Sequence, residues 1–237
     1  MQTPLFFNWS TGKDSALALH RLQNNPDFSV EHLLTSINSH HNRVSMHGLR
    51  RELFEQQMEA LRIPWSTLEL PEQPSMEIYE EQMTKVLNPL LESGFQNTAF
   101  GDIFLEDLRQ YREDKLAPLG INAHFPLWKE DTKLLMEEFF KLGFKAIVIC
   151  VNGSLLDESF VGCDITPEWL ERLPDTVDPC GENGEFHTFC YDGPIFKSSI
   201  SFSVGEKVYR EYDSPGGNGE KSGFWFCDLL PARNATS

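Results

Sequence analysis

Hydrophobic and polar residues follow a pattern in the first half of the chain that predicts strands and helices in alternation. Short apolar runs are separated by longer segments in which apolar side chains recur at helical spacing. The expected strands are residues 5–7, 30–37, 63–70, 98–100 and 121–128, the last ending in a turn, and the expected helices are residues 15–22, 49–61, 77–93 and 106–116. Because repeated strand–helix–strand units of this kind are right-handed and parallel, the pattern predicts an α/β domain with a five-stranded parallel sheet.

From about residue 129 the pattern changes to one typical of an α+β domain. Strand-like runs with Gly and Pro turns dominate, and helices are few. The expected helices are residues 133–142 and a short one ending at 170–174, and the expected strands are residues 144–151, 185–191, 195–204, 207–212 and 223–229. Residues 213–219 are expected to form a flexible loop and residues 231–237 a frayed tail. The sequence thus predicts two domains, residues 1–128 and 129–237.

The charge balance bears on the possible partners. The net charge is −16, from 20 basic and 36 acidic residues. A surface this acidic is poorly suited to nucleic acid, which is bound by clustered Lys and Arg, although it leaves room for a local basic groove. No run of about 18 apolar residues is present, so no membrane contact is expected.

The number and spacing of the cysteines indicate the redox state of the compartment in which the protein is found. They are odd in number and form no C-x-x-C pair, at positions Cys150, Cys163, Cys180, Cys190 and Cys227. We interpret them as reduced thiols of a cytoplasmic protein that has no structural zinc site. Cys180 stands apart because it lies beside an acidic motif.

The stretch Ser10-Thr11-Gly12-Lys13-Asp14-Ser15 joins the first expected strand to the first expected helix. Free N–H groups at a helix N-terminus attract anions, Gly12 permits close approach of the backbone, and Lys13 adds a positive charge. The common phosphate loop, G-x-x-x-x-G-K-[ST], does not match, because Phe7 replaces the first Gly and Asp14 follows the Lys. The simplest alternative is an ordinary strand–turn–helix connection with a capping Asp14.

Other polar residues are expected at the same edge of the sheet, since ligands of parallel sheets bind beyond the carboxyl ends of the strands. Asn38 follows the second strand, and Gly101 and Asp102 follow the fourth. The loop after the second strand also carries three histidines, at positions 40, 41 and 47. They have no carboxylate or Cys at metal-ligand spacing, which favours a polar loop over a metal site.

A second polar motif, Cys180-Gly181-Glu182-Asn183-Gly184-Glu185-Phe186-His187, lies in the second domain. Glu182 and Glu185 flank an Asn-Gly turn, and Glu185 and His187 should face the same way on a strand. Two carboxylates and an imidazole around one turn can bind a cation, orient an amine or move a proton. A hairpin turn flanked by solvated charges explains the same residues equally well.

Taken together, these motifs resemble the diphthine–ammonia ligase family of the PP-loop ATP pyrophosphatases. The PP-loop pattern S-G-G-x-D-S is similar to residues 10–15, with Thr11 in place of one Gly. Further matches follow in the family's order over nearly the whole chain, at Gly101-Asp102-Ile103, Pro126-Leu127-Trp128 and Gly181-Glu182-Asn183-Gly184-Glu185-Phe186. The resemblance implies an ATP-binding domain of the HUP type, with a Rossmann-like sheet, and a C-terminal domain that completes the substrate site.

The resemblance also implies an activity and a set of site residues. ATP would activate a carboxylate as an acyl-adenylate with release of pyrophosphate, and ammonia would then displace AMP. The implied nucleotide site consists of Ser10, Thr11, Gly12, Lys13, Asp14, Ser15, Asn38, Gly101 and Asp102, with Asp14 and Asp102 as Mg²⁺ ligands. The catalytic residues expected on this basis are Lys13, Asp14, Glu182, Glu185 and His187. Glu182 and Glu185 would face the acceptor or the incoming ammonium, and a carboxylate or His187 could take its proton. The carboxylate acceptor is unidentified, and a homodimer is expected because relatives commonly associate.

One departure and two other functions stay open. The family typically has a third acid where this chain has His187, and a bacterial-looking branch shares the domain plan, so the acceptor need not be diphthine. A PP-loop tRNA-modifying or sulphur-transfer enzyme would need a reactive Cys, for which Cys180 is the candidate, and a basic RNA surface. A non-catalytic ATP-binding sensor would have no obvious use for the acidic motif.

Overall fold

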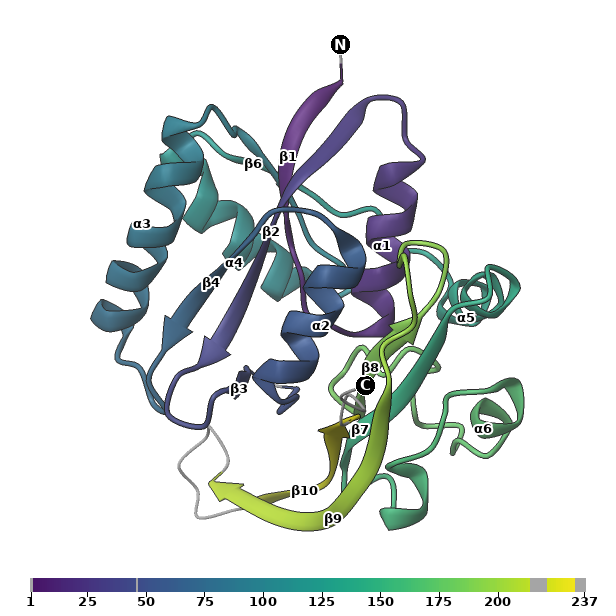
Figure 1. Cartoon of the computed structure of the whole chain (residues 1–237). Coiled ribbons are helices and arrows are strands. Elements are labelled where there is room, and N and C mark those ends of the chain that lie inside the picture. The colour runs from purple at the N-terminus through teal and green to yellow at the C-terminus, as the bar shows by residue number, and fades with distance from the viewer. Residues whose placement is uncertain (1, 46, 214–220, 233–237) are drawn as a thin grey trace, which may run out of the picture.

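Two sheets form the framework of the chain (Figure 1). The structure is a computed structural model that describes residues 2–45, 47–213 and 221–232. Most of the loop expected at 213–219 and of the tail expected at 231–237 lies outside these ranges. Of those two segments, the described residues are Asp213 and Pro231, which end strands, and Ala232.

Five strands of the first sheet pair parallel, in the order β4-β2-β1-β5-β6. Its strands are β1 (Thr3–Asn8), β2 (Phe28–Asn38), β4 (Trp65–Leu70), β5 (Asn97–Ala99) and β6 (Asn122–His124). A short strand, β3 (Arg43–Val44), pairs antiparallel with the end of β2. The prediction of a five-stranded parallel sheet is therefore confirmed, with β3 as an addition that its two-residue length hid from the sequence pattern.

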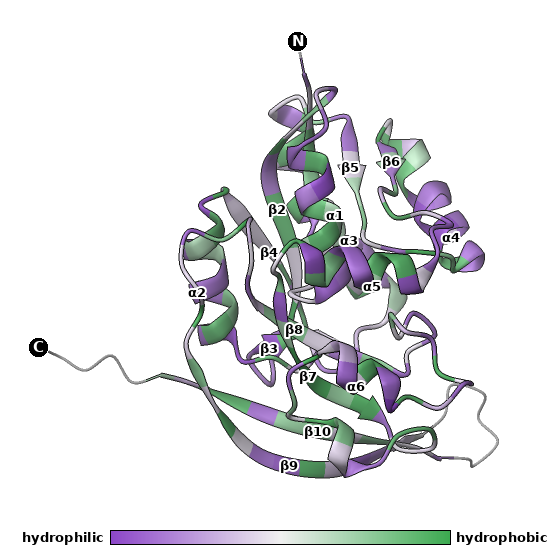
Figure 2. Cartoon of the chain, turned by 90° about the vertical axis from the view of Figure 1, so that its right-hand side faces the viewer, coloured by the Kyte–Doolittle hydropathy of each residue, from purple (hydrophilic) through white to green (hydrophobic). Residues whose placement is uncertain are grey.

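Helices cover both faces of this sheet (Figure 1). They are α1 (Lys13–Gln23), α2 (Arg51–Leu61), α3 (Met76–Glu92) and α4 (Glu106–Leu116), the last continued by the 3₁₀ turn η1 (Ala117–Leu119). Successive residues of β1 point to opposite faces, so Leu5 and Phe7 pack in the cluster of α1 and α2, and Phe6 packs in the cluster of α3 and α4. Figure 2 shows α4 as mostly hydrophilic, and its one buried residue is Leu116. In the described chain, no helix is both long enough and apolar enough to span a bilayer.

The second sheet is antiparallel, in the order β8-β7-β10-β9. Its strands are β7 (Lys145–Asn152), β8 (Phe186–Asp192), β9 (Phe202–Asp213) and β10 (Lys221–Pro231), and its helices are α5 (Thr132–Lys141), α6 (Pro167–Glu171) and the 3₁₀ turn η2 (Glu158–Phe160). One prediction is wrong here, because residues 195–204 and 207–212 are not two strands. Residues 202–213 form one strand, and residues 195–201 form none, since Lys197 N–H bonds to the Ala60 carbonyl at the end of α2 instead of to a strand.

The two sheets share one hydrophobic core. A single cluster of buried side chains contains Phe7 and Phe54 from the first part of the chain and Val148 and Phe189 from the second. Polar contacts cross the same boundary, because Asp228 of β10 accepts hydrogen bonds from Arg43 and Arg50 at 2.6–3.1 Å. The second sheet is therefore packed against the carboxyl edge of the first, where the phosphate loop lies.

Candidate functional site

The centre of the site is the crevice where β1 and β5 end side by side. The helices that follow these two strands, α1 and α4, turn to opposite faces of the sheet (Figure 1). Such a switch point is the usual ligand site of a parallel sheet. A cavity of about 1170 Å³ lies here, lined by the loop after β1, by Gly101 and Asp102 after β5, and by the motif before β8.

The loop after β1 has an unusual backbone conformation at Thr11. Its φ angle is 75°, in the left-handed region that β-branched residues rarely adopt, and its side chain is fully buried. The Thr11 carbonyl accepts hydrogen bonds from Cys190 N–H of β8 at 2.9 Å and from the Gln57 side chain of α2 at 3.1 Å. Ser10 N–H bonds to Ser15 Oγ at 3.1 Å and closes the loop. These contacts hold a conformation that glycine would adopt without strain.

Gly12 lies where β8 meets the start of α1. A Cβ atom at Gly12 would lie 3.1 Å from a His47 ring carbon and 3.2 Å from the Thr188 carbonyl oxygen. The Lys13 N–H donates to Thr188 Oγ1 at 3.1 Å. The missing side chain thus lets the second sheet contact the first turn of α1 directly.

Lys13 is a buried cation at the wall of the cavity. Its side chain is 2% exposed, and its Nζ contacts both carboxylate oxygens of Asp14 at 2.9 and 2.8 Å as well as the Cys180 carbonyl. The Phe186 ring lies 5.1 Å away. Burial opposes the charged form, but Asp14 outweighs it and raises the pKa of Lys13. Lys13 therefore ties α1 to the acidic motif and leaves a positive charge beside the loop.

Glu182 reaches across to the other wall. Its Oε1 accepts hydrogen bonds from the N–H groups of Ile103 and Phe104, at 2.7 and 3.3 Å, directly after Asp102. Burial raises the pKa of Glu182 to about 7, because the two N–H bonds do not fully offset the lost hydration. A carboxyl group with this pKa can exchange a proton near neutral pH, as a general acid or base must.

Glu185 has a different position from Glu182. It is 2% exposed and does not line the cavity. Its carboxylate accepts hydrogen bonds from Asp178 N–H and from the backbone and side-chain N–H groups of Asn183, all at 2.9–3.0 Å. The turn is therefore not flanked by solvated charges, and Glu185 fixes its shape.

His187 lines the cavity together with His47, which the sequence pattern did not single out as a site residue. The two rings stack with centroids 4.9 Å apart, and His47 Nδ1 lies 3.4 Å from Thr11 Oγ1. Burial, reinforced by Lys13, lowers the pKa of His187 to about 4, and burial also lowers the pKa of His47. Both imidazoles are thus neutral at neutral pH and stand next to the phosphate loop.

Of the remaining predicted residues, Gly101 and Asp102 line the cavity and Asn38 does not. Gly101 passes so close to α1 that a Cβ atom there would lie 3.1 Å from Ser15 N. Asp102 lines the cavity and pairs with Arg112 at 2.7 Å. Asn38 is not among the lining residues, because its side chain accepts a hydrogen bond from His41 N–H at 3.0 Å.

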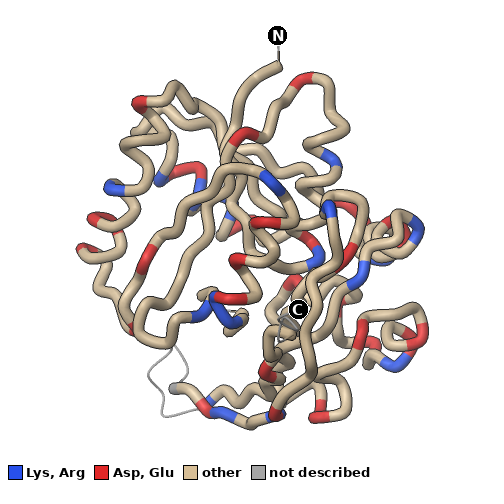
Figure 3. The backbone as a smooth tube through the Cα atoms, viewed as in Figure 1, with Lys and Arg blue, Asp and Glu red and all other residues tan. Residues whose placement is uncertain are grey.

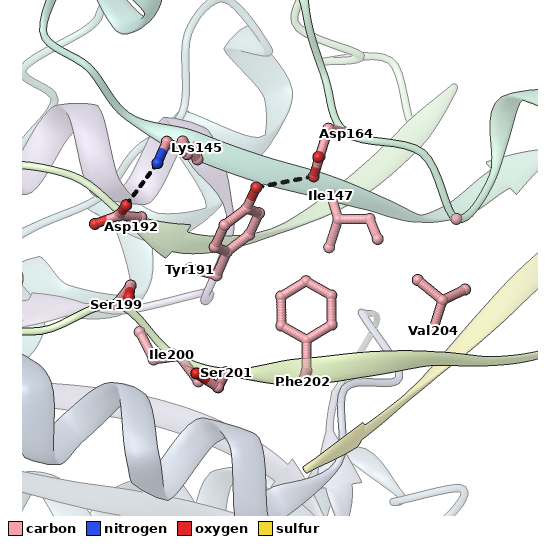
Figure 4. A pocket seen from close by; sticks show the side chains of 11 residues that line it. Lys145, Ile147, Asp164, Tyr191, Asp192, Ser199, Ile200, Ser201, Phe202 and Val204 are labelled. Carbon is pink, nitrogen blue, oxygen red and sulfur yellow. Dashed lines mark hydrogen bonds and ion pairs between the residues drawn. The ribbon is translucent and has the colours of Figure 1, made fainter. Parts of the chain in front are cut away.

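No cysteine is among the residues that line this cavity, although the backbones of Cys180 and Cys190 support the phosphate loop and its Lys13. Cys180 is 2% exposed, its Sγ donates to the Thr132 carbonyl, and burial raises the pKa of its thiol. A separate cavity of about 420 Å³ lies beside β7 and β8, where Lys145 pairs with Asp192 and the Tyr191 hydroxyl donates to Asp164 (Figure 4). It contains none of the predicted site residues.

The residues that sequence reasoning missed are those brought in from distant elements. Gln57 is completely buried, and its amide bonds to Trp9 Nε1 and to the carbonyls of Thr11 and Cys190. Thr188 braces Gly12 and Lys13 from β8. A buried Gln on an otherwise apolar helix face was the one available signal, and it gave no indication of its partners.

The fold and this loop define a member of the PP-loop class of α/β proteins, and comparison with known proteins gives the family. The model of the diphthamide synthase N-terminal domain matches residues 5–122, and the model of the C-terminal domain matches residues 131–215. The chain therefore belongs to the diphthamide synthase family, to which the diphthine–ammonia ligases belong.

Individual relatives agree with this assignment. The diphthine–ammonia ligase of Danio rerio is 31% identical over 116 residues, and that of Mus musculus is 29% identical over 124 residues. These matches cover 46% and 50% of this chain and 46% of each relative, so the chain spans about half the length of the curated relatives it matches. Among solved structures, the U34-tRNA thiolase NcsA from Methanococcus maripaludis aligns with a TM-score of 0.37 and 18% identity, over 60% of this chain and 58% of the thiolase.

Proposed function

We propose that this protein is an ATP-dependent ligase that forms an amide from a carboxylate and ammonia. ATP would activate the carboxylate as an acyl-adenylate, pyrophosphate would leave, and ammonia would displace AMP. The named relatives support this reaction class, and the acceptor is a carboxylate of a small molecule or of a protein side chain. The observation that carries the proposal is that one cavity is lined by the PP-loop and by Glu182 of the second motif.

The phosphates of ATP would bind at the N-terminus of α1. Ser10, Gly12 and Ser15 line the cavity there, and Lys13 supplies positive charge. Asp14 and Asp102 offer carboxylate oxygens, which suit Mg²⁺ that is also held by phosphate oxygens. Bound there, Mg²⁺ would neutralise the charge that develops as pyrophosphate leaves.

Proton transfer falls to Glu182 and His187. Ammonium must lose one proton before its nitrogen can attack the acyl-adenylate, and a second proton leaves as the amide forms. Glu182 can accept the first because burial places its pKa near 7, and the neutral imidazole of His187 can accept the second. Glu185 then acts as a positioning residue, since it holds the turn that carries Glu182.

Product analysis of labelled ATP tests the reaction class. The protein would be incubated with Mg²⁺ and an extract of the source organism, with and without ammonium. AMP and pyrophosphate formed only with ammonium would support the ligase. AMP formed without ammonium would assign a different nucleophile, and ADP would contradict the PP-loop chemistry.

Two variants separate the competing functions. Cys180→Ser should leave turnover unchanged, because the thiol is buried and its raised pKa disfavours a thiolate; loss of turnover would favour sulphur transfer. Glu182→Gln should lower turnover about 100-fold or more while ATP still binds. ATP binding without turnover in the native protein, whatever extract is added, would favour a sensor.

A further inference from the structure

Two histidines that were expected in a polar loop, His40 and His41, converge with Glu72 at the rim of the sheet. His40 and His41 follow β2, and Glu72 follows β4, about thirty residues later. Each offers one ligand atom, and the three atoms lie within 4.8 Å of one another. The expectation that these histidines lack a carboxylate partner is therefore wrong, because the partner comes from the next strand of the sheet and not from their own segment.

The backbone holds the two segments together. β2 and β4 pair in register up to Asn38 and Leu70, and the Leu70 carbonyl then accepts hydrogen bonds from both the N–H and the hydroxyl of Ser39, at 2.8 and 3.0 Å. The Asn38 side chain accepts from His41 N–H and orients the loop. The three side chains thus project from neighbouring strand ends whose relative position is fixed before any ligand arrives.

The spacing of the ligand atoms suits a small divalent cation. His41 Nε2 lies 3.0 Å from one oxygen of Glu72, and His40 Nε2 lies 3.9 Å from the other. Metal–ligand bonds of about 2.0–2.1 Å in a tetrahedral site separate neighbouring ligand atoms by about 3.3 Å. Only small rotations of exposed side chains are needed to reach that geometry.

We propose that His40, His41 and Glu72 form a Zn²⁺ site at the rim of the first sheet. Two imidazoles and one carboxylate favour Zn²⁺ and similar transition metals over Mg²⁺, which prefers oxygen ligands. The three protein ligands leave a fourth position for water or a ligand atom from a bound molecule. This site is separate from the Mg²⁺ ligands proposed above and does not depend on the reaction catalysed.

A bound ion would brace one wall of the cavity. Leu70 and Pro74, which flank Glu72 in the chain, both line it, and α3 begins directly afterwards at Met76. Linking Glu72 to the loop after β2 would restrict the movement of this connection. We therefore expect Zn²⁺ to slow amide hydrogen exchange in residues 38–42 and 71–75.

Zn²⁺ binding to the purified protein tests the site directly. Isothermal titration with zinc chloride, in a buffer with a non-chelating phosphine reductant, should show one Zn²⁺ bound with micromolar affinity. The double variant His40→Ala/His41→Ala and the single variant Glu72→Gln should each weaken binding about tenfold or more. His20→Ala, a histidine outside the cluster, should bind Zn²⁺ like the native protein.

The same variants define the result that would overturn the site. Unchanged Zn²⁺ affinity in either the double-histidine variant or Glu72→Gln would mean that the ion binds elsewhere, and no binding by the native protein would contradict the site outright. Hydrogen exchange supplies a second readout, since protection of the two segments by Zn²⁺ should disappear in Glu72→Gln, and protection that persists would likewise overturn it.

Discussion

At the scale of single residues, the cavity holds an acid and a base that burial keeps uncharged. Glu182 has a pKa of about 7 and His187 a pKa of about 4. Between those values Glu182 is mostly protonated and His187 mostly neutral, so neither side chain brings a net charge to the space beside the phosphate loop. The two groups should therefore affect the pH dependence of stability in opposite directions.

Glu182→Gln should make the protein relatively more stable as the pH rises. In the native state Glu182 keeps a proton that the unfolded chain has lost between about pH 4.5 and 7, so its contribution to the free energy of unfolding falls across that window. The free energy of unfolding of the variant, relative to that of the native protein, should rise by about 1–3 kcal/mol between pH 5 and pH 8. Urea unfolding at each pH measures it. The exposed control Glu59→Gln should show no such gain, and parallel pH profiles for Glu182→Gln would contradict the shift.

His187→Gln should make the protein more tolerant of acid. The unfolded chain takes up a proton at this residue near pH 6.5, whereas native His187 resists it down to about pH 4, so the native protein loses stability as the pH falls through that window. When the pH falls from 7 to 5, the free energy of unfolding should decrease by about 1–2 kcal/mol less in the variant than in the native protein. The matched control is the exposed His40→Gln in a chelating buffer, and an identical acid response in His187→Gln would refute the assignment.

At the scale of elements, the turn before β8 depends on one carboxylate. Glu185→Ala would leave three buried or half-buried N–H groups, on Asp178 and Asn183, without their acceptor. We expect a loss of about 3 kcal/mol in the free energy of unfolding, and a smaller loss for Glu185→Gln, whose amide keeps one acceptor oxygen. Chemical denaturation would measure both, with the exposed Glu206→Ala as control; a loss in Glu185→Ala no larger than in that control would refute the structural role.

The contact between β5 and α1 depends on a missing side chain. Gly101→Ala would place a Cβ atom 3.1 Å from Ser15 N and 3.3 Å from Asp14 C, which are backbone atoms that cannot rotate away. The start of α1 would have to shift, so we expect a loss of about 1–3 kcal/mol in stability. ATP affinity, followed by titration calorimetry, should fall in the same variant, and native values of both quantities would show that the contact is not restrictive.

The elements themselves were largely predictable, and their long-range contacts were not. The helix at residues 106–116 was predicted with the bounds that α4 has, because its charges and its C-terminal Leu116 follow helical spacing. Residues 195–201 were predicted as a strand because they contain Ile195, Phe196 and Ile200, but these side chains pack into the common core without strand pairing. A local hydrophobic pattern predicts that a segment is buried, but it does not predict whether that segment pairs with a neighbouring strand.

In the site, too, local sequence predicted the motifs but not the contacts between distant elements. The phosphate loop and Glu182 were identified from short motifs, whereas His47, Gln57 and Thr188 reach the loop from other elements and leave no local signal. The position of Glu185 in a motif and that of Asn38 at a strand end predict a place in the site for both. The structure turns both side chains towards the backbone of their own loops, away from the cavity.

At the scale of the whole molecule, the shared core predicts that both sheets unfold together. Asp228→Asn weakens the contacts to Arg43 and Arg50 across the boundary and should lower the free energy of unfolding by about 1–2 kcal/mol. Far-ultraviolet circular dichroism and tryptophan fluorescence should shift together, because the same cluster contains Trp9 from β1's end and Trp169 from α6. Two separated transitions, in the native protein or the variant, would mean that the two parts unfold independently.

The excess of acidic over basic residues is also a property of the whole molecule. Figure 3 shows Lys and Arg scattered singly or in small groups among acidic residues. Several of these cations are engaged locally, as Arg112 is with Asp102 and Lys115 with Glu80. Lys13 is also paired, with Asp14 at 2.8 Å, but this pair lies at the cavity, where its charges are less screened by bulk water than those at the surface.

The contact between the Thr11 carbonyl and Cys190 N–H has a consequence for biosynthesis. The phosphate loop is synthesised long before β8, yet the carbonyl of its left-handed residue, Thr11, accepts a hydrogen bond from Cys190 N–H of β8. A nascent chain that ends before Cys190 lacks this hydrogen bond, although all strands of the parallel sheet, the last of which ends at His124, have already been translated. We therefore expect the phosphate loop to reach its final conformation late in translation, after β8 has docked.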